Sequence, residues 1–447
     1  MDILNYIVDL GPSVMMPILF TIFALCLGVK LGKSIKAGLM IGVGFIGLNL
    51  VIGLLTDNLG PAAQSMVENF GLNLNVLDVG WPAAAAIAFG SKVGALIIPI
   101  CLLVNIIMLV TKTTQTVNID IWNYWHFAFT GSIVSVLTGS VGWGIFAAVV
   151  NMIIIMIIAD LTAKGLEEQL GLEGISIPHG FSASFVPIAI VINKILDYIP
   201  GINKIDIDAE SMQNKLGVFA DPVLLGTIIG ALLGVIAKYD LKHILILAVT
   251  MGAVLVLIPK MAAVLMEGLM PVSEATQDLI SKKFNSNGKL YIGLDSAVGI
   301  GHPTTLVVSL LLVPVTLLLS IIVPGNGFLP FASLAGLPFA FVLIVPVTKG
   351  NVFRTFIIGV VIVVCGLLFA TNLAPLFTQA AKLVQFAIPT GSNLVSSIDY
   401  AASPLPWAIV KLLNFKVVGA LIISAFTILF MLYNRKRIIK ESNIESK

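Results

Sequence analysis

Charged residues are scarce in this chain. Only 11% of its 447 residues are Asp, Glu, Lys or Arg, whereas 58% are hydrophobic. A soluble globular domain carries about 25% charged residues, so this sequence has too few charges to cover a surface that faces water. The formal net charge of +2 provides no strong field for nucleic acid. The composition predicts an all-α polytopic membrane protein that does not bind nucleic acid.

Cysteine and the common cofactor-binding motifs are also rare or missing. The three cysteines, Cys26, Cys101 and Cys365, lie in separate apolar runs, and no CxxC or Cys/His spacing indicates a metal site. No phosphate-binding loop is present, so ATP is not expected to drive transport through this chain. We therefore expect neither a metal nor a cofactor. No Lys or Arg precedes Lys30, so the first apolar run is expected to be a membrane span rather than a cleaved signal peptide.

Long apolar runs alternate with short ones along the sequence. A membrane-spanning helix needs about 20 apolar residues, and about eleven runs approach this length. They cover residues 14–29, 37–55, 93–111, 141–160, 181–196, 222–237, 243–265, 305–323, 351–371 and 415–433, with one more inside 383–411. Shorter pieces interrupted by Gly or Pro indicate re-entrant half-helices. These pieces lie at 79–91, 126–138, 292–302 and 328–345.

Basic residues indicate how these spans are oriented. One cluster lies at 30–36, around the first short loop, and another at 435–440, after the last span. Loops rich in Lys and Arg face the cytoplasm. Both clusters reach that side if the N-terminus lies outside and the chain crosses the cell membrane about eleven times. The C-terminus is then cytoplasmic.

The two halves of the sequence resemble each other. Four pairs of segments match in the same order along the chain. They are 34–55 with 239–261, 137–161 with 347–371, IPHG at 177–180 with IPTG at 388–391, and Trp81-Pro82 with His302-Pro303. Paired helix breaks of this kind are typical of carriers built from inverted repeats.

The predicted division of the chain follows from this repeat. Residues 1–196 form a first repeat of five spans, and residues 221–411 form a second. Residues 197–220 form a cytoplasmic linker, and residues 412–447 form the last span and a basic cytoplasmic tail. Because five is an odd number, the second repeat enters the membrane upside down relative to the first.

The candidate substrate site lies near the middle of the bilayer, where the broken helices of the repeats meet. Polar residues inside apolar segments are candidates for it. His179, in GISIPHGFSAS, comes just before a helix start, whose free N–H groups lie beside the imidazole and the Ser182 hydroxyl. This arrangement favours a polar, uncharged solute. The alternative is an ordinary interfacial histidine.

The segment GLDSAVGIGHPTT carries four more candidates: Asp295, Ser296, His302 and Thr304. An ionised carboxylate in an apolar segment is costly unless it is paired or hydrated. Asp295 can accept two hydroxyl groups at once, and His302 can donate or accept a hydrogen bond. These properties suit vicinal hydroxyl groups. The alternative for Asp295 is a simple helix N-cap.

Aromatic segments supply the remaining candidates. Trp81, in DVGWPAAAA, can cover the C–H face of a sugar-like molecule while its indole N–H donates a hydrogen bond. It also fits an interfacial anchor. The run NIDIWNYWHFAFTGS at 118–132 resembles an interfacial aromatic belt, but Asn123 and His126 can turn inward from it.

The strings IPHGFSAS and GLDSAVGIGHPTT, with the frame LGPSVMMPILFTIFALCLGVKLGKSIKAGLMIGVGFIGLNL, carry a family resemblance. Over essentially the whole chain, the sequence resembles the membrane component, enzyme IIC, of galactitol-type phosphoenolpyruvate-dependent phosphotransferase systems (PTS). Ascorbate-type IIC proteins are similar in layout. The resemblance implies that a polyol is imported and phosphorylated during uptake. It implies that the phosphoryl group comes from a phosphocysteine on a separate IIB protein, which IIA charges.

The resemblance also implies a homodimer in membrane lipid, with a substrate-holding core that slides against a scaffold as an elevator. It implies that His179 and Asp295 hold the substrate, with Trp81 and His302 beside it. Asp295 would then orient a hydroxyl group and accept its proton as a possible general base. Because the phosphoryl donor lies on IIB, the chain is expected to be the transporter subunit of a phosphotransferase complex.

Three other functions fit the same residues. An ion-coupled symporter of a small polar solute would share the repeat and leave the solute unmodified. A IIC protein for ascorbate, a pentitol or an acidic sugar would differ in a few hydrogen bonds to its substrate. An intramembrane enzyme that acts on lipid would place its catalytic residues near one membrane face and would lack an inverted repeat.

Overall fold

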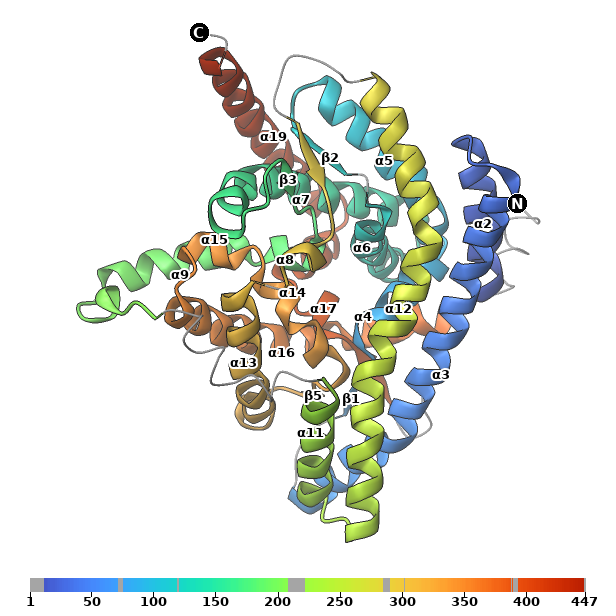
Figure 1. Cartoon of the computed structure of the whole chain (residues 1–447), viewed down its shortest axis with the longest axis vertical. Helices are drawn as coiled ribbons and strands as arrows, with labels where there is room; N and C mark the ends of the chain where they lie inside the picture. Colours follow the sequence, from blue (N-terminus) through green and yellow to red (C-terminus); the bar gives the residue numbers. More distant parts are fainter. Residues whose placement is uncertain are drawn as a thin grey trace.

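The computed structural model describes residues 12–70, 75–118, 120–207, 222–283, 290–300, 302–386, 388 and 393–445. This part of the chain is mostly helical, and it also contains six short strands (Figure 1). The sequence predicted an all-α fold without strands, and the six strands correct that prediction. Three of the residues in the predicted IPTG string, Pro389 to Gly391, lie outside the described residues.

The first half of the chain contains the elements up to η2. They are α2 (Pro12–Cys26), α3 (Leu31–Phe70), β1 (Val76–Asp78), α4 (Gly80–Gly90), α5 (Gly94–Val110), β2 (Thr116–Asn118), η1 (Ile121–Asn123), α6 (Tyr124–Thr138), α7 (Val141–Leu170), β3 (Ile175–Ser176), α8 (Gly180–Ser184), α9 (Val186–Tyr198) and η2 (Ile202–Lys204).

The second half contains a similar series of elements. They are α11 (Pro222–Ile236), α12 (Leu241–Lys283), β4 (Tyr291–Gly293), η4 (Ser296–Gly299), α13 (Pro303–Ile322), β5 (Phe328–Leu329), η5 (Ala332–Gly336), α14 (Leu337–Phe341), α15 (Ile344–Thr348), α16 (Val352–Leu383), β6 (Leu394–Ser396), α17 (Ile398–Ala401), α18 (Pro404–Leu413) and α19 (Val417–Glu445).

Several helices have the length and apolar character of membrane spans. Among the described residues, α7, α13, α16 and α19 pass this test, and the bent pair α4–α5 makes a fifth span if it is counted as one. The axes of α4 and α5 meet at 87°, at the end of the predicted half-helix 79–91. The apolar helices support the predicted membrane protein. The number of about eleven spans and their orientation remain predictions.

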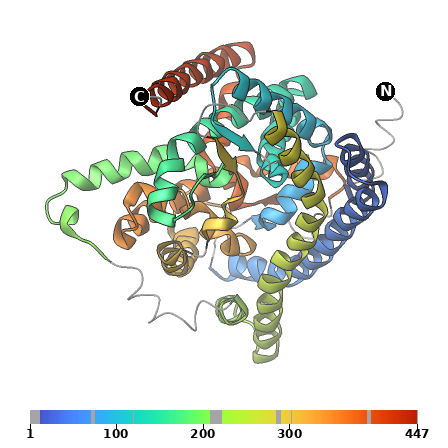
Figure 2. The same ribbon diagram turned by 45° about the horizontal axis from the view of Figure 1, so that its top comes forward.

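Four helices form a group of their own. The long helices α3 and α12 lie side by side along one flank of the molecule, with α2 and α11 against them (Figures 1 and 2). Gly268 of α12 permits close contact, because a Cβ there would lie 2.6 Å from Cγ1 of Ile41 on α3. Small residues at helix contacts let membrane helices approach closely. We call α2, α3, α11 and α12 the scaffold group, and the remaining elements the core.

The six strands form two parallel sheets inside the core. Sheet A has the strand order β5–β1–β6, and sheet B has the order β2–β4–β3. Each central strand comes from one half of the chain and both of its neighbours from the other half. An apolar interior requires every backbone N–H and C=O to be paired. The strands pair these groups where the helices are interrupted.

Asp78 anchors sheet A at the end of β1. Its Oδ1 accepts hydrogen bonds from the Gly80 N–H (3.0 Å) and the Ser333 hydroxyl (2.6 Å). Its Oδ2 accepts from the N–H groups of Phe331 and Ser333, both at 2.7 Å. The buried carboxylate therefore joins β1 to η5, which lies more than 250 residues further along the chain.

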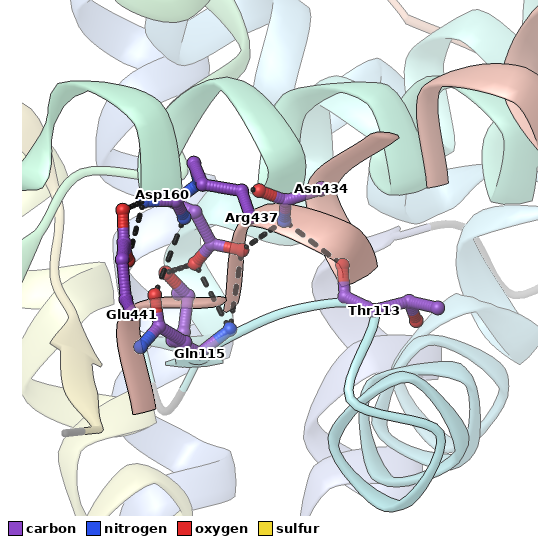
Figure 3. Close-up of polar contacts among 7 residues, drawn as sticks. Thr113, Gln115, Asp160, Asn434, Arg437 and Glu441 are labelled. Atoms are coloured by element: carbon purple, nitrogen blue, oxygen red, sulfur yellow. Dashed lines mark hydrogen bonds and ion pairs between the residues drawn. The ribbon is translucent and has the colours of Figure 1, made fainter. Parts of the chain in front are cut away.

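Asp160 has a comparable role beside sheet B (Figure 3). This buried side chain of α7 accepts hydrogen bonds from the Gln115 N–H (3.1 Å), the Thr116 hydroxyl (2.7 Å) and Nδ2 of Asn434 (2.7 Å). Arg437 donates to Oε1 of Gln115 at 3.2 Å. The cluster thus fixes the approach to β2 against both α7 and the C-terminal helix α19.

The described part of the predicted linker 197–220 lies against α16. Nδ2 of Asn351, the N-cap residue of α16, donates to the Ile205 carbonyl at 2.8 Å and to Oδ1 of Asp206 at 3.0 Å. Arg354 donates to Oδ1 of Asp197 at 2.6 Å. Residues 208–221 of this region lie outside the described residues.

The four hydrogen bonds to Asp78 predict that its carboxylate stabilises the fold. We expect Asp78→Asn to lower the free energy of unfolding by about 3 kcal/mol, because the amide nitrogen would point N–H groups at buried donors. The measurement is the thermal unfolding midpoint of the purified protein in detergent. Asp240→Asn, at an exposed position, is the control and is expected to change the midpoint little. An unchanged midpoint in Asp78→Asn would contradict this role.

Candidate functional site

The ends of the strands converge on one region of the core. Asp120 lies two residues beyond β2, Asp295 two residues beyond β4, and His179 three residues beyond β3. The carboxyl ends of neighbouring parallel strands meet at the same edge of a sheet, so sheet B brings these three side chains together. Asp399 lies three residues beyond β6 of sheet A.

A cavity of about 140 Å³ occupies this region. Most of its lining is aromatic, and its polar lining residues come from both halves of the chain. The lining residues are Trp81, Trp122, Trp125, His126, His179, Phe181, Asp295, Ala297, Phe339 and Asp399.

His179 is the N-cap residue of α8. Its Nδ1 accepts a hydrogen bond from the Ser182 N–H at 3.3 Å, which assigns the proton of the neutral ring to Nε2. Nε2 lies 3.5 Å from Oδ2 of Asp295. The Ser182 hydroxyl donates to the Phe339 carbonyl and so helps to fix the imidazole against α14. The sequence of a proline, a histidine and a short helix start therefore produces a buried imidazole whose N–H points toward a carboxylate.

Asp295 has one satisfied and one unsatisfied oxygen. Its Oδ1 accepts a hydrogen bond from the Ala297 N–H at 2.7 Å, so the N-cap expected from the sequence is present. Its backbone N–H donates to Oδ2 of Asp120 at 3.1 Å. Its Oδ2 is buried and has no hydrogen-bond partner. The contact with His179 is too long for a good hydrogen bond, so a ligand hydroxyl that lies beside the pair can bond to both groups.

Two further polar atoms of the lining residues are buried without partners. They are Nε1 of Trp125 and Nε2 of His126. The two rings stack with centroids 3.8 Å apart, and the His126 ring meets the His179 ring edge-on at 4.3 Å. Nδ1 of His126 lies 3.3 Å from the Asn123 carbonyl and is its donor, which leaves Nε2 as an acceptor. The cavity therefore offers both donors and acceptors, as hydroxyl groups require.

Aromatic rings form the apolar walls of the cavity. Trp81 meets Trp122 edge-on with centroids 5.8 Å apart and lies 6.3 Å from Phe339. Phe339 in turn stacks on the His179 ring at 5.8 Å. Such faces suit the C–H groups of a carbohydrate-like molecule. The described residues contain no group of three or more His, Cys, Asp or Glu side chains able to hold a metal ion.

The remaining sequence candidates are not among the residues that line the cavity. Ser182 supports His179, and Nδ2 of Asn123 donates to Oδ1 of Asn118 at 3.3 Å. The Thr304 hydroxyl donates to the Gly350 carbonyl at 2.8 Å. The buried Ser296 hydroxyl has no partner, and His302 is only partly buried.

Sequence reasoning missed six of the lining residues. Trp122 and Trp125 were assigned to an aromatic belt, and Phe181, Ala297 and Phe339 resemble ordinary apolar residues. Asp399 lies in SSIDYAASPLP, inside the predicted span 383–411. The likeness of YAASPLP at 400–406 to FSASFVP at 181–187 is the signal that would have found it, because the second string follows His179 closely.

Comparison with known proteins gives one consistent result. The chain matches the family EIIC-GAT, described as "PTS system sugar-specific permease component", over residues 6–391. It is 40% identical over 442 residues to the "PTS system galactitol-specific EIIC component" of Escherichia coli strain K12, covering 98% of this chain and 97% of that protein. The protein of the same name from Escherichia coli O157:H7 matches with the same identity and coverage.

Because α8 lies close to His126, we expect a larger residue at the start of α8 to disturb the site. A Cβ on Gly180 would lie 2.5 Å from Cβ of His126, so Gly180→Ala should push His126 away from His179. We expect ligand affinity to fall at least tenfold, since each lost hydrogen bond is worth about 1 kcal/mol or more. Ligand binding to the purified protein measures this. Gly142→Ala is the control, because its Cβ would meet only Oγ of Ser140, at 3.6 Å. Equal affinities in both variants would contradict the packing argument.

Proposed function

This chain belongs to the family of sugar-specific permease components of phosphotransferase systems, and from this premise we propose that it imports galactitol. In this proposal the chain carries the polyol through the cell membrane and presents it for phosphorylation by separate PTS proteins. Galactitol is taken from the name of the relatives, and the polar and aromatic groups of the cavity suit a molecule of that kind. A related polyol, a pentitol or ascorbate is the alternative substrate if the transport test below yields no galactitol phosphate.

The observation that carries the proposal is the unpaired Oδ2 of Asp295 beside the Nε2–H of His179. A buried carboxylate oxygen without a partner is costly, and a polyol hydroxyl supplies the missing donor. Nε1 of Trp125 and Nε2 of His126 add a donor and an acceptor for other hydroxyl groups. Trp81 and Phe339 would cover the C–H faces of the ligand.

The remaining sequence candidates take supporting positions in this proposal. Ser182 and Asn123 would hold His179 and His126 in place through the hydrogen bonds described above. Ser296, His302 and Thr304 lie off the cavity lining, and a role for them in substrate binding remains a prediction.

The proposed chemistry needs a partner protein. A hydroxyl oxygen of galactitol would attack the phosphorus of a phosphocysteine on IIB, so that a P–O bond forms, the P–S bond breaks and the cysteine leaves as a thiolate. Asp295 would orient the hydroxyl group and accept its proton. Positioning supplies much of the catalysis in phosphoryl transfer. IIA would recharge IIB, and this chain would carry no phosphoryl group itself.

We also propose that the chain is built as an inverted repeat, with residues 1–196 as the first copy and 221–411 as the second. Sheet composition supports this proposal: exchanging β1 with β4, β2 with β5 and β3 with β6 converts sheet A into sheet B. Helix lengths agree, since α2 and α11 both have 15 residues, α3 and α12 have 40 and 43, and α7 and α16 have 30 and 32. Asp78, the last residue of β1, and Asp295, two residues beyond β4, then have similar but not identical places, and each accepts a hydrogen bond from the N–H two residues later.

The separation of scaffold and core supports an elevator mechanism in a homodimer. One face of α3 exposes a row of apolar side chains at helical spacing, namely Leu31, Ile35, Leu39, Val43, Ile46 and Leu50. Such a row suits lipid or a second copy of the chain. We propose that the scaffold group forms the stationary dimer and that the core slides along it. The N-terminus would lie outside, and the basic end of α19 in the cytoplasm.

The transport proposal is tested with membrane vesicles that contain this chain and labelled galactitol. With IIA, IIB and phosphoenolpyruvate we expect galactitol phosphate to accumulate, and without them no concentrated product. Asp295→Asn should lower this uptake at least a hundredfold, because it replaces one acceptor oxygen by an N–H donor and removes the group that accepts the proton. Asp240→Asn is the control. Accumulation of free galactitol without the partners would indicate an ion-coupled symporter, and wild-type uptake by Asp295→Asn would overturn the site.

The elevator proposal makes a separate prediction. Phe20 of α2 and Phe89 of α4 meet edge-on with ring centroids 6.4 Å apart, so they join scaffold to core. In a background without Cys26, Cys101 and Cys365, a mercury cross-link between Phe20→Cys and Phe89→Cys should abolish transport.

The matched control for this cross-link lies within the scaffold group. A Cβ on Gly47 of α3 would contact Met261 of α12, so Gly47→Cys and Met261→Cys should also cross-link. Because both helices are proposed to stay together, this second cross-link is expected to leave transport largely intact. Loss of transport with both pairs, or with neither, would be inconsistent with an elevator.

A further inference from the structure

Asp399 is a second buried carboxylate on the cavity, and no role described so far uses it. It lies on the short helix α17 and is 3% exposed. It lines the same cavity as Asp295. The two carboxylates come from different sheets, since Asp295 follows β4 of sheet B and Asp399 follows β6 of sheet A. The cavity therefore has one carboxylate from the end of each sheet.

Neighbouring residues hold Asp399 in place. Asp78, which is close by, receives four donors and is fully engaged in joining β1 to η5. Asp399 accepts at Oδ2 from the Ser397 hydroxyl, at 3.1 Å. The Ile398 N–H donates to Oγ of Ser333 at 3.0 Å, which fixes the start of α17. Asp78 thus has a structural position, and Asp399 faces the cavity from a rigid support.

The main chain opposite Asp399 leaves room for its carboxylate. A Cβ on Gly336 of η5 would collide with Oδ1 of Asp399. The glycine therefore lets the carboxylate lie directly against the backbone.

We propose that Asp399 binds hydroxyl groups of the polyol that Asp295 and His179 do not reach, and so determines which linear polyols are accepted. This inference deepens the proposed function and rests on it for the class of substrate. A linear polyol carries a hydroxyl group on every carbon, and one carboxylate–imidazole pair can contact only some of them. A site built to hydrogen-bond a hydroxyl group rejects an analogue that lacks it, because its own buried polar group is then left unpaired.

The experiment measures equilibrium binding of polyols to the purified full-length protein in detergent, without IIA, IIB or phosphoenolpyruvate. The ligands are galactitol and its six singly deoxygenated analogues, which form three pairs of enantiomers because galactitol is a meso compound. Asp399→Asn is compared with wild type and with Asp240→Asn. We expect Asp399→Asn to weaken galactitol about ten- to hundredfold, the range for a hydrogen bond to a charged group. One deoxy analogue should bind poorly to wild type and show little further loss in Asp399→Asn.

A purely structural role for Asp399 predicts a different pattern. In that case Asp399→Asn would weaken galactitol and all six analogues by the same factor, and this result would overturn the proposal, as would unchanged binding. Gly336→Ala displaces the carboxylate without removing it and is expected to reproduce the ligand-selective pattern. Size-exclusion chromatography checks that both variants are folded.

If the proposed function is wrong, the binding experiment gives a third pattern of results. If wild-type protein binds another polyol instead of galactitol, the substrate assignment is wrong, and the same comparison is made with that polyol and its deoxy analogues. A ligand-selective effect of Asp399→Asn there would keep the role of Asp399. A uniform effect would remove it.

Discussion

The fold depends on one constraint: backbone N–H and C=O groups inside an apolar bundle must be paired. A helix meets this requirement along its length but not at its ends. The core of this protein interrupts its helices repeatedly, and each interruption exposes such groups. Two three-stranded parallel sheets pair them, and the buried carboxylates of Asp78 and Asp160 bind the N–H groups that remain. Because parallel strands end together, the same solution gathers Asp120, Asp295 and His179 at one edge.

The buried acids therefore divide into two kinds. Asp78 and Asp160 are surrounded by donors from distant parts of the chain and hold the sheets in position. Asp295 keeps one oxygen without a partner. In the proposed repeat Asp78 and Asp295 both lie at the carboxyl end of a central strand, but Asp78 serves the structure and Asp295 serves the ligand. Because of this difference, the two similar halves form one ligand site rather than two.

The sequence predicted the helical frame and part of the site for a simple reason. Polar residues are conspicuous in apolar segments, and that rule selected His179, Asp295 and His126, which line the cavity. Trp81, which also lines it, was selected as an aromatic residue. The strands were beyond the reach of that rule, since β3 has two residues and pairs with β4 more than a hundred residues away. Asp399 was missed because its segment resembles a proline-broken span. The same rule selected His302 and Thr304, at the start of α13, but neither residue lines the cavity. Only the packing of α13 in the structure shows this.

The unlike walls of the cavity have a stereochemical consequence. Galactitol is a meso compound, so its two ends are mirror images and exchange by symmetry. A cavity with Asp295 and His179 from one sheet and Asp399 from the other is itself chiral, and it binds the two enantiotopic ends in different surroundings. If the phosphoryl group reaches the hydroxyl group beside Asp295, only one end is modified. The proposed reaction then desymmetrises its substrate and yields a single enantiomer of the sugar-alcohol phosphate.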